Sequence, residues 1–284
     1  MRTITKLLLA MAMPAALLAA QGASSATLIT QWNYENMAAF TAFTSSAPLA
    51  PFAVTGSNPN AAVYTLAPPV PPANPLAGAP TKLSWGNPKG AQPSSLVVTD
   101  KVGPATVDTN GINVLDLTIT HNNFVIGLGQ SLATAELTGA LLLQPALPVL
   151  GSAFGPLVAS FKILFKETNN AGPCPTGVPA CPDIFVLDTA NSDPLENIDL
   201  GIIDGYQYTL NVVIALLDLN DASCTAAGSA AGCTGFVTQE GVSNALPVFF
   251  NIKGRPVEVP EPGMLALLGL GLAGLGFGQI RRRK

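Results

Sequence analysis

The chain has 284 residues, of which 13 are basic and 17 acidic, and its net charge is −4. Six of the cations lie in the two terminal segments, so the body from Thr27 to Glu261 keeps seven basic residues against 17 acidic ones, a net charge near −10. The body contains no basic cluster, which argues against anionic lipid as a partner and excludes nucleic acid. Its scarce charges, with 27 Gly and 25 Pro spread over the chain, indicate short strands and turns in an all-β extracellular protein.

The first 26 residues have the organisation of a secretory signal peptide. Cations near the start precede an apolar stretch over residues 7–20, and Ser24, Ser25 and Ala26 fit the small-x-small cleavage rule. We therefore expect residues 1–26 to be removed and the exported chain to begin at Thr27.

Hydrophobic residues alternate with period two in several segments of the body, as in strands with one buried face. The clearest case is residues 206–216, where six apolar side chains share one face. The body is too small for several large cores, so we predict one β-sandwich, jelly-roll-like, over residues 27–258. The expected strands lie within residues 112–121, 161–166, 183–187, 206–216 and 248–252.

Two segments interrupt this pattern. Ala67–Pro80 holds six prolines in 14 residues, which predicts a rigid surface loop within the domain. The segment Leu132–Leu150 is rich in Ala and Leu, and we expect it to include one short helix interrupted by Pro145 and Pro148.

The four cysteines form two close pairs in loop-like sequence. In an exported protein, nearest neighbours are expected to form the disulfides Cys174–Cys181 and Cys224–Cys233. The alternative is a zinc site, which is disfavoured because neither pair has CxxC spacing and the chain's one histidine is distant in sequence.

His121, the one histidine, shares a strand face with Leu115, Leu117 and Ile119. This position favours a buried, hydrogen-bonded side chain over a catalytic base, because neither a nucleophile nor an orienting carboxylate can be located. Ser131 lies in a sequence that only approaches a nucleophile elbow and lacks its final glycine. No catalytic residue is predicted, and we expect the protein not to be an enzyme.

An acidic stretch runs from Asp183 to Asp221 without a cation. Calcium suits oxygen-rich loops outside the cell, and Asp193, Glu196 and Asp199 are the candidate ligands. The spacing matches neither an EF-hand nor a nonapeptide repeat, and a soluble acidic surface explains the stretch equally well. Otherwise no cofactor is expected.

Four aromatic residues are candidates for stacking on sugars in a lectin-like groove. With so few aromatics in the chain, the alternative is that most of them belong to the core. The residues are Trp32, Tyr64, Trp85 and Tyr206.

The last 26 residues, 259–284, have three parts in a fixed order: a short Pro-rich motif, an apolar segment and a basic end. The segment Met264–Ile280 has 17 residues, about 26 Å as a helix, the short end of a membrane crossing. The cations of residues 281–284 would then lie on the cytoplasmic side, with the body outside. The motif consists of Val259, Pro260, Glu261, Pro262 and Gly263.

These three parts together resemble the PEP-CTERM sorting signal. The resemblance implies recognition of the motif by a membrane-embedded exosortase, removal of the tail, and a Gram-negative bacterium that makes exopolysaccharide. It covers about a tenth of the chain. The alternative is an ordinary C-terminal anchor that contains the Pro-Glu-Pro sequence by chance.

A second resemblance rests on Thr120, His121 and Asn123, which match the Thr-His-x-Asn motif of the THxN group of these proteins. The segments around Trp85 and over residues 161–168 are similar to the same group. No established activity comes with this resemblance.

The sequence therefore predicts an exported protein that is anchored in the inner membrane as a precursor and then delivered to the cell surface or extracellular matrix. A structural or adhesive role in an exopolysaccharide-rich biofilm is expected. The alternatives are a carbohydrate-binding module and a secreted hydrolase.

Overall fold

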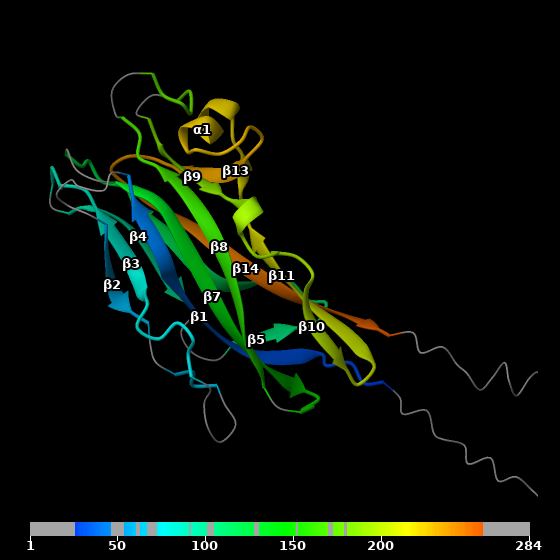
Figure 1. The fold of residues 1–284 in the computed structure, drawn as a ribbon. Helices are drawn as coiled ribbons and strands as arrows, with labels where there is room; N and C mark the ends of the chain where they lie inside the picture. The colour runs from blue at the N-terminus through cyan, green and yellow to red at the C-terminus, as the bar shows by residue number, and fades with distance from the viewer. Residues whose placement is uncertain are drawn as a thin grey trace, which may run out of the picture.

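The structure, a computed structural model, is a sandwich of two antiparallel β-sheets (Figure 1), which confirms the predicted all-β class. Each sheet has seven strands among the described residues. The description covers residues 26–46, 54–60, 63–66, 73–90, 92–100, 105–127, 131–151, 153–169, 173–178 and 181–257. The predicted signal peptide (apart from Ala26) and the predicted membrane helix lie outside these residues.

The chain crosses repeatedly between the two sheets. From edge to edge, the first sheet contains β12 (Leu217–Asp218), β13 (Thr234–Thr238), β9 (Asp183–Leu187), β8 (Phe154–Lys166), β7 (Leu132–Leu147), β1 (Gln31–Ser45) and β5 (Ala105–Asp108). The second contains β10 (Ile198–Ile203), β11 (Tyr206–Ile214), β14 (Ser243–Pro256), β6 (Val114–Asn122), β4 (Ser94–Asp100), β3 (Pro80–Trp85) and β2 (Thr55–Pro59). The described helices are short: α1 (Asp221–Ala226) and the 3-10 turn η1 (Thr189–Asn191).

Alternating side chains from both sheets fill the interior, as the period-two pattern predicts. Phe161, Ile163 and Phe165 of β8 are all buried, and so are Tyr208 and Leu210 of β11. Each such side chain contributes about 1.5–3 kcal/mol when it is fully removed from water. The core therefore follows directly from the alternation in the sequence.

The alternation of β6 changes phase at a β-bulge. Val248 of β14 pairs with Leu117, but its neighbour Phe249 pairs with Leu115, so β6 has one extra residue at Asp116. A bulge of this kind moves the following side chains to the opposite face. Leu115 is therefore 37% exposed rather than buried as predicted, and Val114 packs against the core in its place.

The prediction of a short helix within residues 132–150 is wrong, because Leu132–Leu147 forms the long strand β7. This strand lies between β1 and β8, and its many hydrogen bonds to both outweigh the helical preference of Ala and Leu. Pro145 is tolerated in β7 for two reasons. Its pairing with Trp32 of β1 lies next to a register shift, and the part of β7 that pairs with β8 ends before Pro145.

The described flanks of the proline-rich segment cover part of the outer face of the first sheet. Tyr64, Leu66 and Leu76 are buried against Met37 and Ala140. The hydroxyl of Tyr64 donates a hydrogen bond to the carbonyl of Ala140 at 2.9 Å. These flanks therefore belong to the same domain, although they form a packed layer rather than a simple surface loop.

Both predicted disulfides are present, Cys174–Cys181 and Cys224–Cys233. The second lies beside α1, whose first turn is capped by the Asn220 side chain, which accepts a hydrogen bond from the Ser223 amide at 2.8 Å. In Figure 1, α1, β9 and β13 lie at one end of the sandwich, called here the distal end.

The two ends of the described domain meet at the opposite end of the sandwich, called here the tail end (Figure 1). The Thr27 amide donates to the carbonyl of Asp204 at 3.2 Å, and the Val257 amide donates to the carbonyl of Gly205 at 2.8 Å. Both ends of the described domain are thus fixed to the turn between β10 and β11. The segment that leads to Val259–Gly263 leaves the domain here.

Candidate functional site

The residues of the Thr-His-x-Asn sequence lie at the distal end of β6, where they hold the turn between β13 and β14. His121 Nδ1 lies 2.8 Å from the Thr238 hydroxyl, and Asn123 Nδ2 donates to the Thr238 carbonyl at 3.1 Å. The backbone of Asn123 bonds to both Gly241 and Val242. Thr120 alternates to the other face of β6 and is half-buried.

His121 is buried in an aromatic cluster, as predicted from its position in the strand. Its ring stacks on Trp85 with centroids 5.5 Å apart and 10° between the planes, while Phe165 and Phe185 meet it edge-on. Its Nε2 is buried without a hydrogen-bond partner among the described residues. Burial lowers the pKa of His121 to about 3, so the ring is neutral. A fully buried ring of this kind supports the turn rather than reacting with a ligand.

Three carboxylates converge beside this aromatic cluster. Glu167 follows β8, Asp183 begins β9 and Glu240 lies in the turn that His121 and Asn123 hold. One carboxylate oxygen from each of the three lies within 4.8 Å of the other two. Asp183 is fully buried, whereas Glu167 and Glu240 are partly exposed.

Fixed hydrogen bonds orient two of these carboxylates. Trp85 Nε1 donates to Glu167 at 3.1 Å, and the Thr168 amide donates to Asp183 Oδ1 at 2.8 Å. The hydroxyl of Thr168 donates in turn to the carbonyl of Cys181 at 2.5 Å, which connects the cluster to the first disulfide loop. The arrangement is therefore built on strand ends and a cross-linked loop.

The electrostatics of the cluster disfavour three negative charges. Burial, and then the charge of Glu167, raises the pKa of Asp183 to about 9. Burial also raises the pKa of Glu167 to about 7; the hydrogen bond from Trp85 opposes this and the charge of Glu240 adds to it. In the absence of a bound cation, Asp183 and Glu167 therefore tend to retain protons at neutral pH.

The predicted calcium ligands are not brought together in this way. Asp193, Glu196 and Asp199 do not form a cluster of ligand atoms in the part of the chain that the structure describes. Asp193 instead accepts the Ser160 amide at 2.7 Å, and Asp199 accepts the Gly201 amide at 2.7 Å. These two carboxylates thus stabilise the backbone of neighbouring segments.

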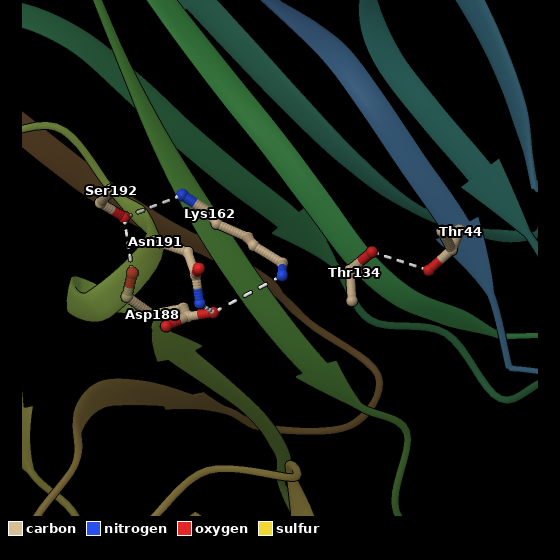
Figure 2. A network of polar contacts seen from close by, with 6 residues as sticks. All are labelled: Thr44, Thr134, Lys162, Asp188, Asn191 and Ser192. Atoms are coloured by element: carbon tan, nitrogen blue, oxygen red, sulfur yellow. Dashed lines mark hydrogen bonds and ion pairs between the residues drawn. The ribbon is translucent and has the colours of Figure 1, made fainter.

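Another acid of the same stretch forms a polar network on the outer face of the first sheet (Figure 2). The Asp188 carboxylate lies 3.6 Å from Lys162 Nζ and accepts a hydrogen bond from Asn191 Nδ2 at 2.8 Å. Nearby, the hydroxyls of Thr44 and Thr134 lie 2.7 Å apart between β1 and β7. The acidic stretch is therefore partly neutralised by a cation from another strand.

The candidate sugar-stacking residues are mostly core residues. Trp32, Tyr64 and Trp85 are at most 1% exposed, and Tyr206 is half-buried. Trp32 packs edge-on against Tyr208, and its Nε1 donates to Thr109 at 2.9 Å. The described structure therefore does not assemble these four into a groove. Ser131 exchanges hydrogen bonds with Ser46, whereas the His121 ring hydrogen-bonds to Thr238 instead.

Two members of the carboxylate cluster, Glu167 and Glu240, were not predicted from the sequence. Glu167 continues the parity of Phe161, Ile163 and Phe165, and a carboxylate on the buried face of a strand is a usable signal. Nothing in the sequence links Glu240 to this position, because only the fold brings the turn after β13 beside β8 and β9.

The predicted sorting segment lies beyond the described domain, and none of the described helices is long and apolar enough to cross a membrane. Residues 258–283 match the family model of the PEP-CTERM protein-sorting motif. No curated protein matches the chain at a significant level.

The fold and the matched tail define an exported β-sandwich protein with a C-terminal sorting signal. The match supports a membrane-anchored precursor that an exosortase processes and sorts to the cell surface of a Gram-negative bacterium. Because the family model covers only the tail, membership of the THxN group stays a prediction.

Proposed function

We propose that the protein is a structural or adhesive component of an exopolysaccharide-rich envelope or biofilm. One observation carries the proposal: both ends of the domain lie at the tail end, next to the segment that carries the matched sorting motif. The distal end, with both disulfide loops and the carboxylate cluster, is then free to face outward. An arrangement of this kind suits a domain that is presented at a surface.

The chain length supports this orientation. Six residues separate Val257 from the predicted membrane helix at Met264, and they span at most roughly 25 Å when extended. Before processing, the tail end of the sandwich is therefore held close to the membrane. The distal end points away because it lies at the other end of the molecule (Figure 1).

The site chemistry supports a role without catalysis. His121 is fully buried, neutral and stacked on Trp85, so it is not placed to act as a base toward a bound substrate. The alternative, a carbohydrate-binding module that stacks sugars on aromatic rings, has no support from the geometry. Trp32 and Tyr64 are buried in the core, as Trp85 is. Contact with polysaccharide would instead use polar surface residues, such as the exposed Thr44 and Asn191 of the network in Figure 2.

The sorting part of the proposal is tested by changing Pro260, Glu261 and Pro262 together to alanine in the full chain. We expect unprocessed precursor to accumulate in the inner membrane, because the exosortase recognises this motif. Fractionation followed by immunoblotting measures it. The matched control is Asp218→Ala, which removes an exposed carboxylate outside residues 258–283 and should be processed normally. Normal release of the triple variant would contradict the proposal.

The adhesive part needs a separate measurement. The released protein should sediment with exopolysaccharide isolated from the producing cells, and deletion of its gene should reduce attachment of the biofilm. A released protein that neither sediments with the polysaccharide nor affects attachment would overturn this part while leaving the sorting result intact.

A further inference from the structure

We infer that Glu167, Asp183 and Glu240 form a binding site for a divalent cation, and that the cation is Ca²⁺. The inference does not depend on the sorting signal, because it rests on the interior of the described domain.

The spacing of the three carboxylates fits one shared ion. Ca²⁺ binds oxygen ligands at about 2.3–2.6 Å, so two oxygens on the same ion lie at most about 5 Å apart. One oxygen from each of Glu167, Asp183 and Glu240 meets this limit, since all three lie within 4.8 Å of one another. The three residues come from separate segments, so the fold has brought them together across a long sequence distance.

A second observation points to a missing ligand at this position. Asp183 is 0% exposed and contributes to the cluster, and its Oδ1 is occupied by the Thr168 amide. Its Oδ2 is buried yet has no hydrogen-bond partner among the described residues. Such an oxygen is costly to bury, and a cation in the cluster would satisfy it.

Counter-charge from the described residues does not account for two of the three carboxylates. In the described part of the chain, neither Glu167 nor Asp183 forms an ion pair with a lysine or arginine, and the ion pair between Lys162 and Asp188 lies elsewhere.

The ligand chemistry selects calcium. All three donors are carboxylates, the hard oxygen ligands that Ca²⁺ and Mg²⁺ prefer, and the group of ligand atoms includes no nitrogen of His121. Both carboxylate oxygens of Glu240 are buried, so this donor group lies inside the protein rather than in open solvent. Ca²⁺ tolerates irregular coordination, whereas Mg²⁺ demands a near-octahedral shell that three fixed carboxylates from different segments do not supply.

A bound ion would join three parts of the distal end. Glu167 extends β8, Asp183 begins β9, and Glu240 belongs to the turn that His121 and Asn123 hold. Calcium would therefore cross-link the distal end of the sandwich outside the cell, where it is available.

The inference is tested by calorimetric titration of CaCl₂ into the full chain, purified in detergent and freed of metal with EDTA, at pH 7.5. We expect one ion per chain, a higher melting temperature with Ca²⁺, and a much smaller effect of Mg²⁺. Asp183→Asn and Glu240→Gln each remove a proposed ligand. Each should weaken calcium binding by more than the roughly 10- to 100-fold loss that is typical when a residue that only orients a ligand is removed. A cooperative thermal unfolding transition in EDTA is recorded for each variant to show that it is folded, because Asp183 and the carboxylate oxygens of Glu240 are all buried.

The matched control is Glu196→Gln, which removes an exposed acid of the acidic stretch outside the cluster. It should bind Ca²⁺ like the original chain. Absence of both binding heat and a calcium-dependent melting shift in the folded original chain would overturn the inference and leave a proton-sharing carboxylate cluster. Binding that survives Glu240→Gln but is lost in Glu196→Gln would also overturn it and favour the acidic stretch.

Discussion

His121 shows how a reactive residue type becomes a structural one when its surroundings change its chemistry. Its ring is packed between Trp85 and two phenylalanines, and its contact with Thr238 joins β6 to the end of β13. Burial in an apolar cluster disfavours the charged imidazolium, which removes the property that makes histidine useful as an acid or base.

We predict that His121→Ala lowers the free energy of unfolding by about 3 kcal/mol or more, the range for truncating a buried aromatic ring. Urea unfolding followed by circular dichroism measures the change. His121→Phe keeps the ring stacking and removes the unpaired Nε2, so it should cost only about 1 kcal/mol for the lost contact with Thr238. An alanine variant as stable as the original chain would show that the ring is not part of the core.

At the scale of elements, the sequence predicts strands well where a single alternation extends through the element. The segment 161–166 and the segment 206–214 have the expected buried faces, because their partners lie in regular register. The phase change in β6 was not predictable, since a bulge depends on how Leu115 and Leu117 pair with β14. In β7, composition favoured a helix and pairing with two neighbouring strands decided otherwise.

In the candidate site too, features set by the local sequence could be predicted, and features set by strand pairing could not. Burial of His121 follows from its parity with Leu117 and Ile119, and both disulfides follow from proximity in sequence. The carboxylate cluster joins Glu167 and Glu240, which are 73 positions apart and meet only through the sheet order. Local patterns carry no information about such a meeting.

The turn between β13 and β14 depends on contacts from the end of β6. We predict that Asn123→Ala speeds amide hydrogen exchange at Gly241, because the side-chain bond from Asn123 to the Thr238 carbonyl is lost. The loss of stability should be about 1 kcal/mol. Asn211→Ala, which removes a hydrogen bond to Asn251 in another part of the second sheet, is the control. Equal exchange at Gly241 in all three proteins would contradict the proposed clamp.

At the scale of the whole molecule, buried acids make stability depend on pH. Burial raises the pKa of Glu167, Asp100 and Asp116 to about 7 and that of Asp183 to about 9. Between these values and the unfolded values near 4, the folded state binds more protons, so stability falls as the pH rises. His121, with its pKa lowered to about 3, has the opposite effect below about pH 6.5 and offsets part of the change.

We therefore predict that the metal-free protein loses stability from about pH 5 to pH 9, by up to about 1.4 kcal/mol per pH unit for each titrating group. Asp183→Asn should flatten the curve between pH 7 and pH 9, where Asp183 titrates. Urea midpoints measured across this range in EDTA provide the test. A curve in which the original chain becomes more stable toward pH 9 would contradict the assignment of these raised pKa values.

The meeting of the two ends of the described domain at the turn between β10 and β11 has a mechanical consequence. A chain held beyond Val257 transmits tension directly into β14, which pairs with β11 along residues 248–256 and with β6 along residues 243–250. Force applied between the tail end and the distal end acts along this doubly paired strand, so many hydrogen bonds share the load. The domain is thus attached through a strand that is paired on both sides, with β11 and with β6.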